Sequence, residues 1–196
     1  MKKLTLIAVM LVAFSIDANA YTISKVGSFN AYQYNEFLDK HIAKKGEVWV
    51  GITEEGKENV IVRIDGGLKT LEITMARDSG TYEYFTTAIN KMVEWTEVAK
   101  TNSVDIKKDF PNQNVGCHTW TSRCSMSFSS WANGQKSTMY LNLKDTENQF
   151  YTFNGQIIYS DVTLLKEIID TQVQIGLDKR RSALVDDPAN KEDLFQ

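Results

Sequence analysis

Apolar and polar residues alternate with a period of two through part of the first half of the chain. Every second residue is apolar in three runs, 48–52, 60–64 and 71–75. Two polar turns, 54–57 and 65–67, each containing glycine, separate these runs. Strict alternation is typical of strands that bury one face and solvate the other. The pattern predicts a three-stranded antiparallel meander.

Three other segments space their apolar residues by three and four, which favours helices. After a short strand at 21–26, a helix is predicted at 30–45, and its buried stripe would comprise Tyr34, Phe37, Leu38, His41 and Ile42. A second helix is predicted at 81–100, with Phe85, Ile89, Met92 and Ala99 facing inward. A third would begin near residue 160 and bury Leu165, Ile168, Ile169, Gln172 and Ile175.

The dipeptide Asn133-Gly134 is the strongest local signal in the chain. A type I′ hairpin turn needs positive φ at both central residues, which Asn and Gly tolerate. A two-residue loop would place Phe128 opposite Met139 and Met126 opposite Leu141. The other face would pair Ser127 with Tyr140, Ser129 with Thr138 and Trp131 with Lys136. A slip of one residue would reverse every side chain, so this sorting by polarity predicts the register.

Two further turns complete the expected second half. A turn at 145–148 would bring Leu143 opposite Phe150, and Asn154-Gly155 would form another turn. The predicted fold class is α+β, with one antiparallel sheet of two meanders, about 6–7 strands, and three helices packed mainly on one face. Strands followed by a helix occur in each half. An old duplication would explain this repeated order of elements, and so would the common packing of a helix on a meander.

The first twenty residues have the pattern of an export signal. Lys2 and Lys3 precede an apolar stretch at 4–16, and a small-x-small pattern ends at Ala20. That stretch is too short for a stable transmembrane helix. We therefore predict a Sec-type signal peptide, 1–20, cleaved before Tyr21. The expected location is the bacterial periplasm or the medium.

The rest of the chain is expected to form one domain, 21–185, followed by a disordered acidic tail, 186–196. The formal net charge is −3, and this mild acidity argues against a nucleic-acid partner, which would show a basic face. No second apolar stretch of membrane length follows the signal, so no stable membrane anchor is expected. The oligomeric state is left open.

The two cysteines, Cys117 and Cys124, are expected to form a disulfide outside the cytoplasm, and a free reactive thiol pair is the alternative. The ring would hold His118, Trp120 and Arg123, and Trp and Arg are frequent interface anchors. This predicts a rigid contact loop. The alternative is that the disulfide fixes a strand end while Trp120 folds onto the core. A histidine inside a small disulfide ring resembles the inhibitory loop of periplasmic lysozyme inhibitors over these eight residues, and no residue role is carried over.

The face of the predicted hairpin opposite the core is a second candidate surface. Ser125, Ser127 and Ser129 alternate with core residues, and Trp131 and Tyr140 share their side. If no helix covers it, this face presents hydroxyl groups and aromatic rings. Such a surface suits contact with a protein or a glycan, and it equally suits exposure to water.

No catalytic residues, metal ligands or cofactor motif are predicted. The two histidines, His41 and His118, are not part of a zinc-binding pattern. These features favour an exported, non-enzymatic binding module, such as an inhibitor or immunity-type protein, whose partner is another protein of the cell envelope. Two alternatives stay open: a hydrolase of envelope polymers with a site assembled from scattered residues, and a component of envelope assembly.

Overall fold

A computed structural model describes residues 22–35, 37–67, 70–110, 115–117, 119–145 and 152–186. The predicted signal peptide and residues 187–196 of the predicted tail lie outside the described residues. Asp186, the first residue assigned to the tail, is instead the last residue of a helix.

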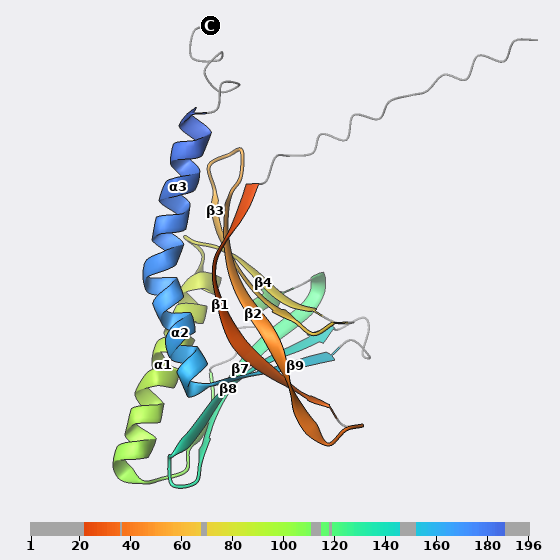
Figure 1. The fold of residues 1–196 in the computed structure, drawn as a ribbon, viewed down its shortest axis with the longest axis vertical. Helices are drawn as coiled ribbons and strands as arrows, with labels where there is room; N and C mark the ends of the chain where they lie inside the picture. Colours follow the sequence, from red (N-terminus) through yellow and green to blue (C-terminus); the bar gives the residue numbers. More distant parts are fainter. Residues whose placement is uncertain are drawn as a thin grey trace, which may run out of the picture.

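The fold is α+β, as predicted, and its described strands form one antiparallel sheet (Figure 1). Eight of the nine described strands run in the order β4-β3-β2-β1-β9-β8-β7-β5, and the ninth, β6, also pairs with β7. The strands are β1 (Thr22–Asn35), β2 (Lys40–Ile52), β3 (Glu58–Asp65), β4 (Thr70–Ala76), β5 (Lys107–Asp109), β6 (Val115–Cys117), β7 (Thr119–Trp131), β8 (Lys136–Asp145) and β9 (Thr152–Ile158). The helices are α1 (Gly80–Asn102), α2 (Tyr159–Glu167), the π-helical turn η1 (Ile168–Gln172) and α3 (Val173–Asp186). The sequence predicted about 6–7 strands and three helices, whereas the described residues form nine strands and the helical segments α1, α2, η1 and α3.

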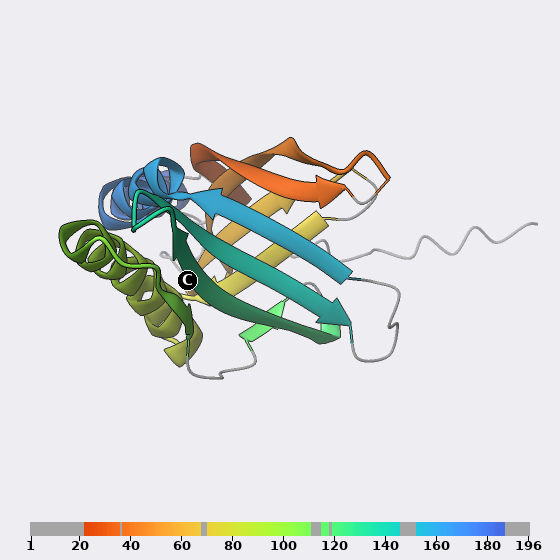
Figure 2. The ribbon, with the colours of Figure 1, turned by 90° about the horizontal axis from the view of Figure 1, so that it is seen from below.

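The sheet curves so that its two halves face each other, and the helices lie along one side of it (Figure 2). α1 packs on β4 and β7, whereas α2 and α3 pack on β1 and its neighbours. Trp95 of α1 anchors this contact, because its ring stacks on Phe110 with centroids 5.0 Å apart and lies 5.7 Å from Phe128. α1 begins at its N-cap Ser79, whose hydroxyl accepts the N–H of Tyr82.

The inner face of the sheet carries the core, and the predicted meander is confirmed. Val48 pairs with Val62, which pairs with Ile73, and all three are buried. The predicted hairpin is also confirmed, with Phe128 opposite Met139 and Met126 opposite Leu141. The fully buried large side chains are Phe85, Phe128, Phe153, Ile64, Leu71, Ile73, Met75, Ile89, Met92, Met139 and Leu141.

The helix predicted at 30–45 is wrong, because this segment belongs to the β1–β2 hairpin. Phe29 and Ala31 are buried by alternation along β1, and Tyr32 and Gln33 pair with β9. The supposed helical stripe is not buried: Phe37 is 101% exposed and His41 is also exposed. Long-range pairing here overrides a spacing that is compatible with a helix.

The predictions around β9 need two corrections. Leu143 pairs with Phe153 rather than Phe150. Gly155 lies inside β9, opposite Leu141, rather than in a turn. A Cβ on this glycine would lie 3.1 Å from Cδ1 of Ile64, so its small size allows β9 to approach β3 across the inner face.

The last helix buries Leu165, Ile168 and Ile169 as predicted, but Gln172 and Ile175 are exposed. Val173 and Leu177 are buried in their place. The reason is η1, because a π turn inserts one extra residue into the helix. The residues of α3 that face the core are therefore shifted along the sequence.

Candidate functional site

A groove lies on the outer face of the sheet, over the strands β1, β9, β8 and β7. It encloses about 450 Å³ and is lined by Tyr32, His41, Trp131, Thr138, Tyr140, Gln156 and Ile158. In Figure 2, β8 and β9 lie in front, and no helix crosses them. The groove therefore occupies the side of the sheet away from the core.

Strand register assembles this groove. Tyr32 of β1 pairs with Gln156 of β9, and Gln156 pairs in turn with Tyr140 of β8. Directly paired residues point to the same side of a sheet, so three side chains from distant parts of the chain form one row. Thr138 and Ile158 form the next pair on the same face. The sheet thus positions the groove rigidly.

Two further side chains flank this row. Trp131 ends β7 and is 40% exposed, which leaves part of its indole ring accessible. His41 comes from β2, and its ring lies 5.3 Å from that of Tyr34. The groove therefore has an aromatic or heteroaromatic side chain on either side of the row.

The side chains that line the groove carry no fixed charge. None of the seven lining residues is an Asp, Glu, Lys or Arg. Burial raises the pKa of the Tyr140 phenol, so this hydroxyl stays neutral at ordinary pH. Gln156, Thr138 and the tyrosine hydroxyls supply hydrogen-bonding groups among the rings. Such a lining suits a neutral group with an apolar or aromatic surface.

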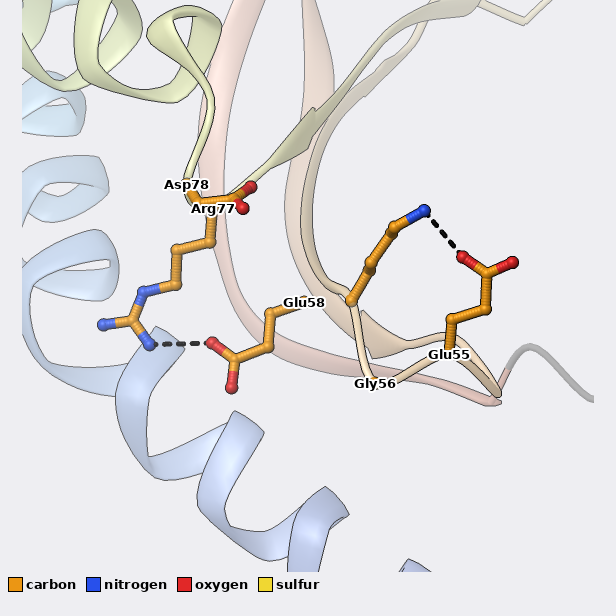
Figure 3. Close-up of a pocket in the computed structure, with 6 residues that line it drawn as sticks. Glu55, Gly56, Glu58, Arg77 and Asp78 are labelled. Atoms are coloured by element: carbon orange, nitrogen blue, oxygen red, sulfur yellow. Dashed lines mark hydrogen bonds and ion pairs between the residues drawn. The ribbon is translucent and has the colours of Figure 1, made fainter.

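A second cavity, of about 390 Å³, has the opposite character (Figure 3). It is lined by Glu55, Gly56, Lys57, Glu58, Arg77 and Asp78. Arg77 donates to Glu58 at 3.1 Å, and Arg181 of α3 also donates to Glu58. Glu58 thereby ties β3 to α3.

The carboxylate at the other end of this cavity is also paired. Lys57 lies 2.6 Å from Glu55, and this hydrogen bond lowers the pKa of the Glu55 carboxyl. A general acid at neutral pH needs a raised pKa instead. The second cavity therefore has the character of a set of ion pairs rather than of a proton-transfer site.

The described part of the chain has neither a metal-ligand cluster nor a helix that could span a membrane. It contains no group of three His, Cys, Asp or Glu side chains that could hold a metal ion. None of its helices is both long and apolar enough to cross a membrane.

The predicted contact loop corresponds to the β6–β7 hairpin, where Gly116 pairs with Arg123. His118 lies outside the described residues, as do the side chains of Trp120 and Arg123. Cys124 is 1% exposed and is not a free thiol. The side chain of Cys117 is outside the described part, so the Cys117–Cys124 disulfide stays a prediction.

The loop and the groove lie along the same strand. Cys124 is three residues from Ser127, which pairs with Tyr140 of the groove, and seven from Trp131, which corresponds to roughly 10 Å and 20 Å at the rise of a strand. The sequence had indicated Trp131 and Tyr140 on the outer face of the hairpin. It missed Tyr32, His41 and Gln156, because their segments were assigned to a helix and to the neighbourhood of a turn. Alternation around Phe29 and Ala31 was the signal that could have found Tyr32.

No protein-family model, no curated protein and no solved structure matches this chain.

Proposed function

We propose that this chain is an exported, non-enzymatic binding module that recognises another protein of the cell envelope through its outer-face groove. The observation that carries the proposal is a groove lined by aromatic side chains, without Asp, Glu, Lys or Arg, on a sheet face that none of the described helices crosses. A preformed groove of this kind accepts an apolar or aromatic side chain of a partner at little entropic cost.

Binding accounts for the groove better than catalysis does. Hydrolysis of an envelope polymer would require two carboxylates, or a nucleophile and a base, that converge on one cavity. The groove has no carboxylate in its lining, and Glu55 and Glu58 of the other cavity are engaged in ion pairs, so neither cavity offers the carboxylate pair. The proposal therefore places recognition, and no chemical step, at the groove.

The surroundings of the groove resemble the edge of a protein interface. Ser127 and Ser129 belong to the same outer face, as partners of Tyr140 and Thr138. Hydroxyl groups around an aromatic centre form a polar rim that can exclude water from the anchor. The predicted loop with His118, Trp120 and Arg123 would provide a second contact at the other end of β7. If the partner is an enzyme, the module would act as its inhibitor or immunity protein.

The export step has a direct test. The intact mass of protein isolated from the periplasm or medium should correspond to a chain that begins at Tyr21. Alkylation in denaturant without reductant should leave both cysteines unmodified. Retention of Met1, or two alkylated thiols, would contradict the proposed location and the proposed disulfide respectively.

The binding surface is tested with a partner that is captured from an envelope extract, identified and then purified. Trp131→Ala should weaken its affinity at least about tenfold in calorimetry, as expected for an interface anchor. Ile175→Ala is the matched control, because Ile175 is 45% exposed on α3 and Trp131 is 40% exposed. The loop variant Trp120→Ala/Arg123→Ala measures the second contact separately. Equal affinities for the wild type and Trp131→Ala would rule out the groove as the binding surface.

A further inference from the structure

The end of the β1–β2 hairpin extends beyond the rest of the sheet. β2 pairs with β3 only from Lys45 onward, and β1 pairs with β9 only at Tyr32 and Gln33. Among the described residues, Tyr34 and Asn35 therefore pair only with His41 and Lys40, and 42–44 pair only with 31–33 of β1. We call the described residues 34–35 and 37–44 the arm, which projects from the sheet at the lower right of Figure 1.

Two large apolar side chains occupy the tip of the arm. Phe37 is 101% exposed and Leu38 is 56% exposed, and Tyr34 behind them is 43% exposed. A two-stranded ribbon is marginally stable in water and has no core of its own. Its apolar tip therefore gains nothing by burial within the described structure, which points to a surface outside the chain.

The turn holds these side chains outward before any contact is made. The Asn35 side chain accepts the N–H of Leu38 at 3.0 Å, and the Tyr34 hydroxyl donates to the Asp39 carboxylate. Asp39 has a left-handed φ of 45°, which closes the turn. A tip fixed in this way loses little conformational entropy when it docks.

We infer that the arm docks reversibly on a lipid bilayer by inserting Phe37 and Leu38 into the interfacial region. The shape of the tip favours a bilayer over a protein. A specific protein interface buries about 800 Å² on each partner, and two side chains at the end of a narrow ribbon provide far less. A bilayer accepts a convex apolar wedge without a complementary pocket.

The residues around the tip fit this environment. Tyr34 presents an apolar ring with a hydroxyl, a combination enriched at the level of lipid headgroups. Lys40 and Lys44 carry long apolar stems beneath charged ends, and the Lys44 ammonium already reaches the carbonyl of Gly66 at 3.0 Å. Two acidic residues, Glu36 and Asp39, balance these two lysines in the sequence. The contact is therefore apolar in origin and depends little on anionic lipid or on salt.

Flotation with large unilamellar vesicles tests this inference on the full mature chain. Wild-type protein should partition onto phosphatidylcholine vesicles and onto vesicles that also contain phosphatidylglycerol, at low and at high salt. Phe37→Ser/Leu38→Ser should reduce partitioning at least about tenfold, because it removes most of the apolar surface of the tip. Val104→Ser/Ile175→Ser is the matched control, since these side chains are 41% and 45% exposed elsewhere. It should partition like the wild type.

A second readout reports the depth of the tip directly. In Phe37→Trp, the added indole should be quenched by brominated lipids more strongly than the native tryptophans of the wild type. Failure of the wild type to float, unchanged partitioning of the tip variant, or binding that disappears at high salt would each overturn the inference. Loss of a concentration-dependent dimer in the tip variant, measured by sedimentation, would instead identify a second copy as the occupant. The groove variant Trp131→Ala should float normally, so this test is independent of the proposed function.

Discussion

Asp161 is the residue that fastens the last helical unit to the first strand. Its side chain is 6% exposed and accepts two hydrogen bonds from Asn30, one from the backbone N–H at 2.9 Å and one from the side-chain amide at 3.1 Å. It also lies in the first turn of α2, where a negative charge is favourable. This one carboxylate therefore accepts hydrogen bonds from β1 and also stabilises the N-terminus of α2.

Asp161→Ala should lower the free energy of unfolding by about 1–3 kcal/mol, because the part-buried N–H of Asn30 loses its acceptor. Urea denaturation monitored by circular dichroism measures the change. Asp161→Asn keeps an acceptor oxygen and should cost less than Asp161→Ala. If the two variants were equally stable, the hydrogen bonds of Asn30 would have no part in the effect.

For single residues, cross-strand pairs could be predicted from the sequence where the two partners lie close together along the chain. The Phe128–Met139 and Met126–Leu141 pairs follow from one turn and were correct. Tyr32 and its partner Gln156 could not be paired in this way, because no local pattern links residues so far apart. The candidate groove was therefore only half visible in the sequence.

Among the elements, α3 approaches the sheet closely through Gly176. A Cβ at this position would lie 2.9 Å from Cγ2 of Val50 and closer still to Cγ1 of Val26. Valine side chains are stiff, so neither methyl can move away without strain. The glycine thus sets the distance between α3 and the strands β1 and β2.

Gly176→Ala should destabilise the fold by about 1–3 kcal/mol, since overpacking outweighs the gain in helix propensity. Gly80→Ala is the control, because a Cβ there meets no atom within 4 Å. It should be neutral or slightly stabilising. Thermal unfolding of both variants measures the difference, and a stabilised Gly176→Ala would show that α3 does not pack as described.

The elements themselves were predicted where their signals are local. Strict alternation gave β2 to β4 from Val48 onward, and Asn133-Gly134 gave the β7–β8 hairpin. The helix expected at 30–45 failed because its spaced apolar residues lie in a hairpin whose pairing is tertiary. The face of α3 was misassigned because a π turn leaves no recognisable mark in the sequence.

Across the whole molecule, stability should be lowest in the arm. Peptides covering 37–44 should exchange their amide hydrogens at least about 100-fold faster than peptides covering 60–64. The reason is that β3 is hydrogen-bonded on both sides, to β2 and to β4, whereas the end of the arm has one partner strand. Hydrogen exchange with mass spectrometry provides the comparison, and equal protection would mean that the arm is packed against another part of the chain.

The overall fold class could be predicted because it follows from the balance of alternating and helical segments. The order of the strands in the sheet could not be predicted from the sequence. Each half of the sheet is a set of neighbours along the chain, but the join between the halves is the pair β1 and β9. Only this pairing creates the row of Tyr32, Gln156 and Tyr140.

The same join imposes an order of events on a chain that is synthesised from its N-terminal side. β1 precedes every other described element, yet its partner β9 ends at residue 158. The meander β2 to β4 can form early, while the edge of β1 that faces β9 stays unpaired until β9 has been made. Closure of the sheet is thus a late step, and until then that edge is open to chaperones.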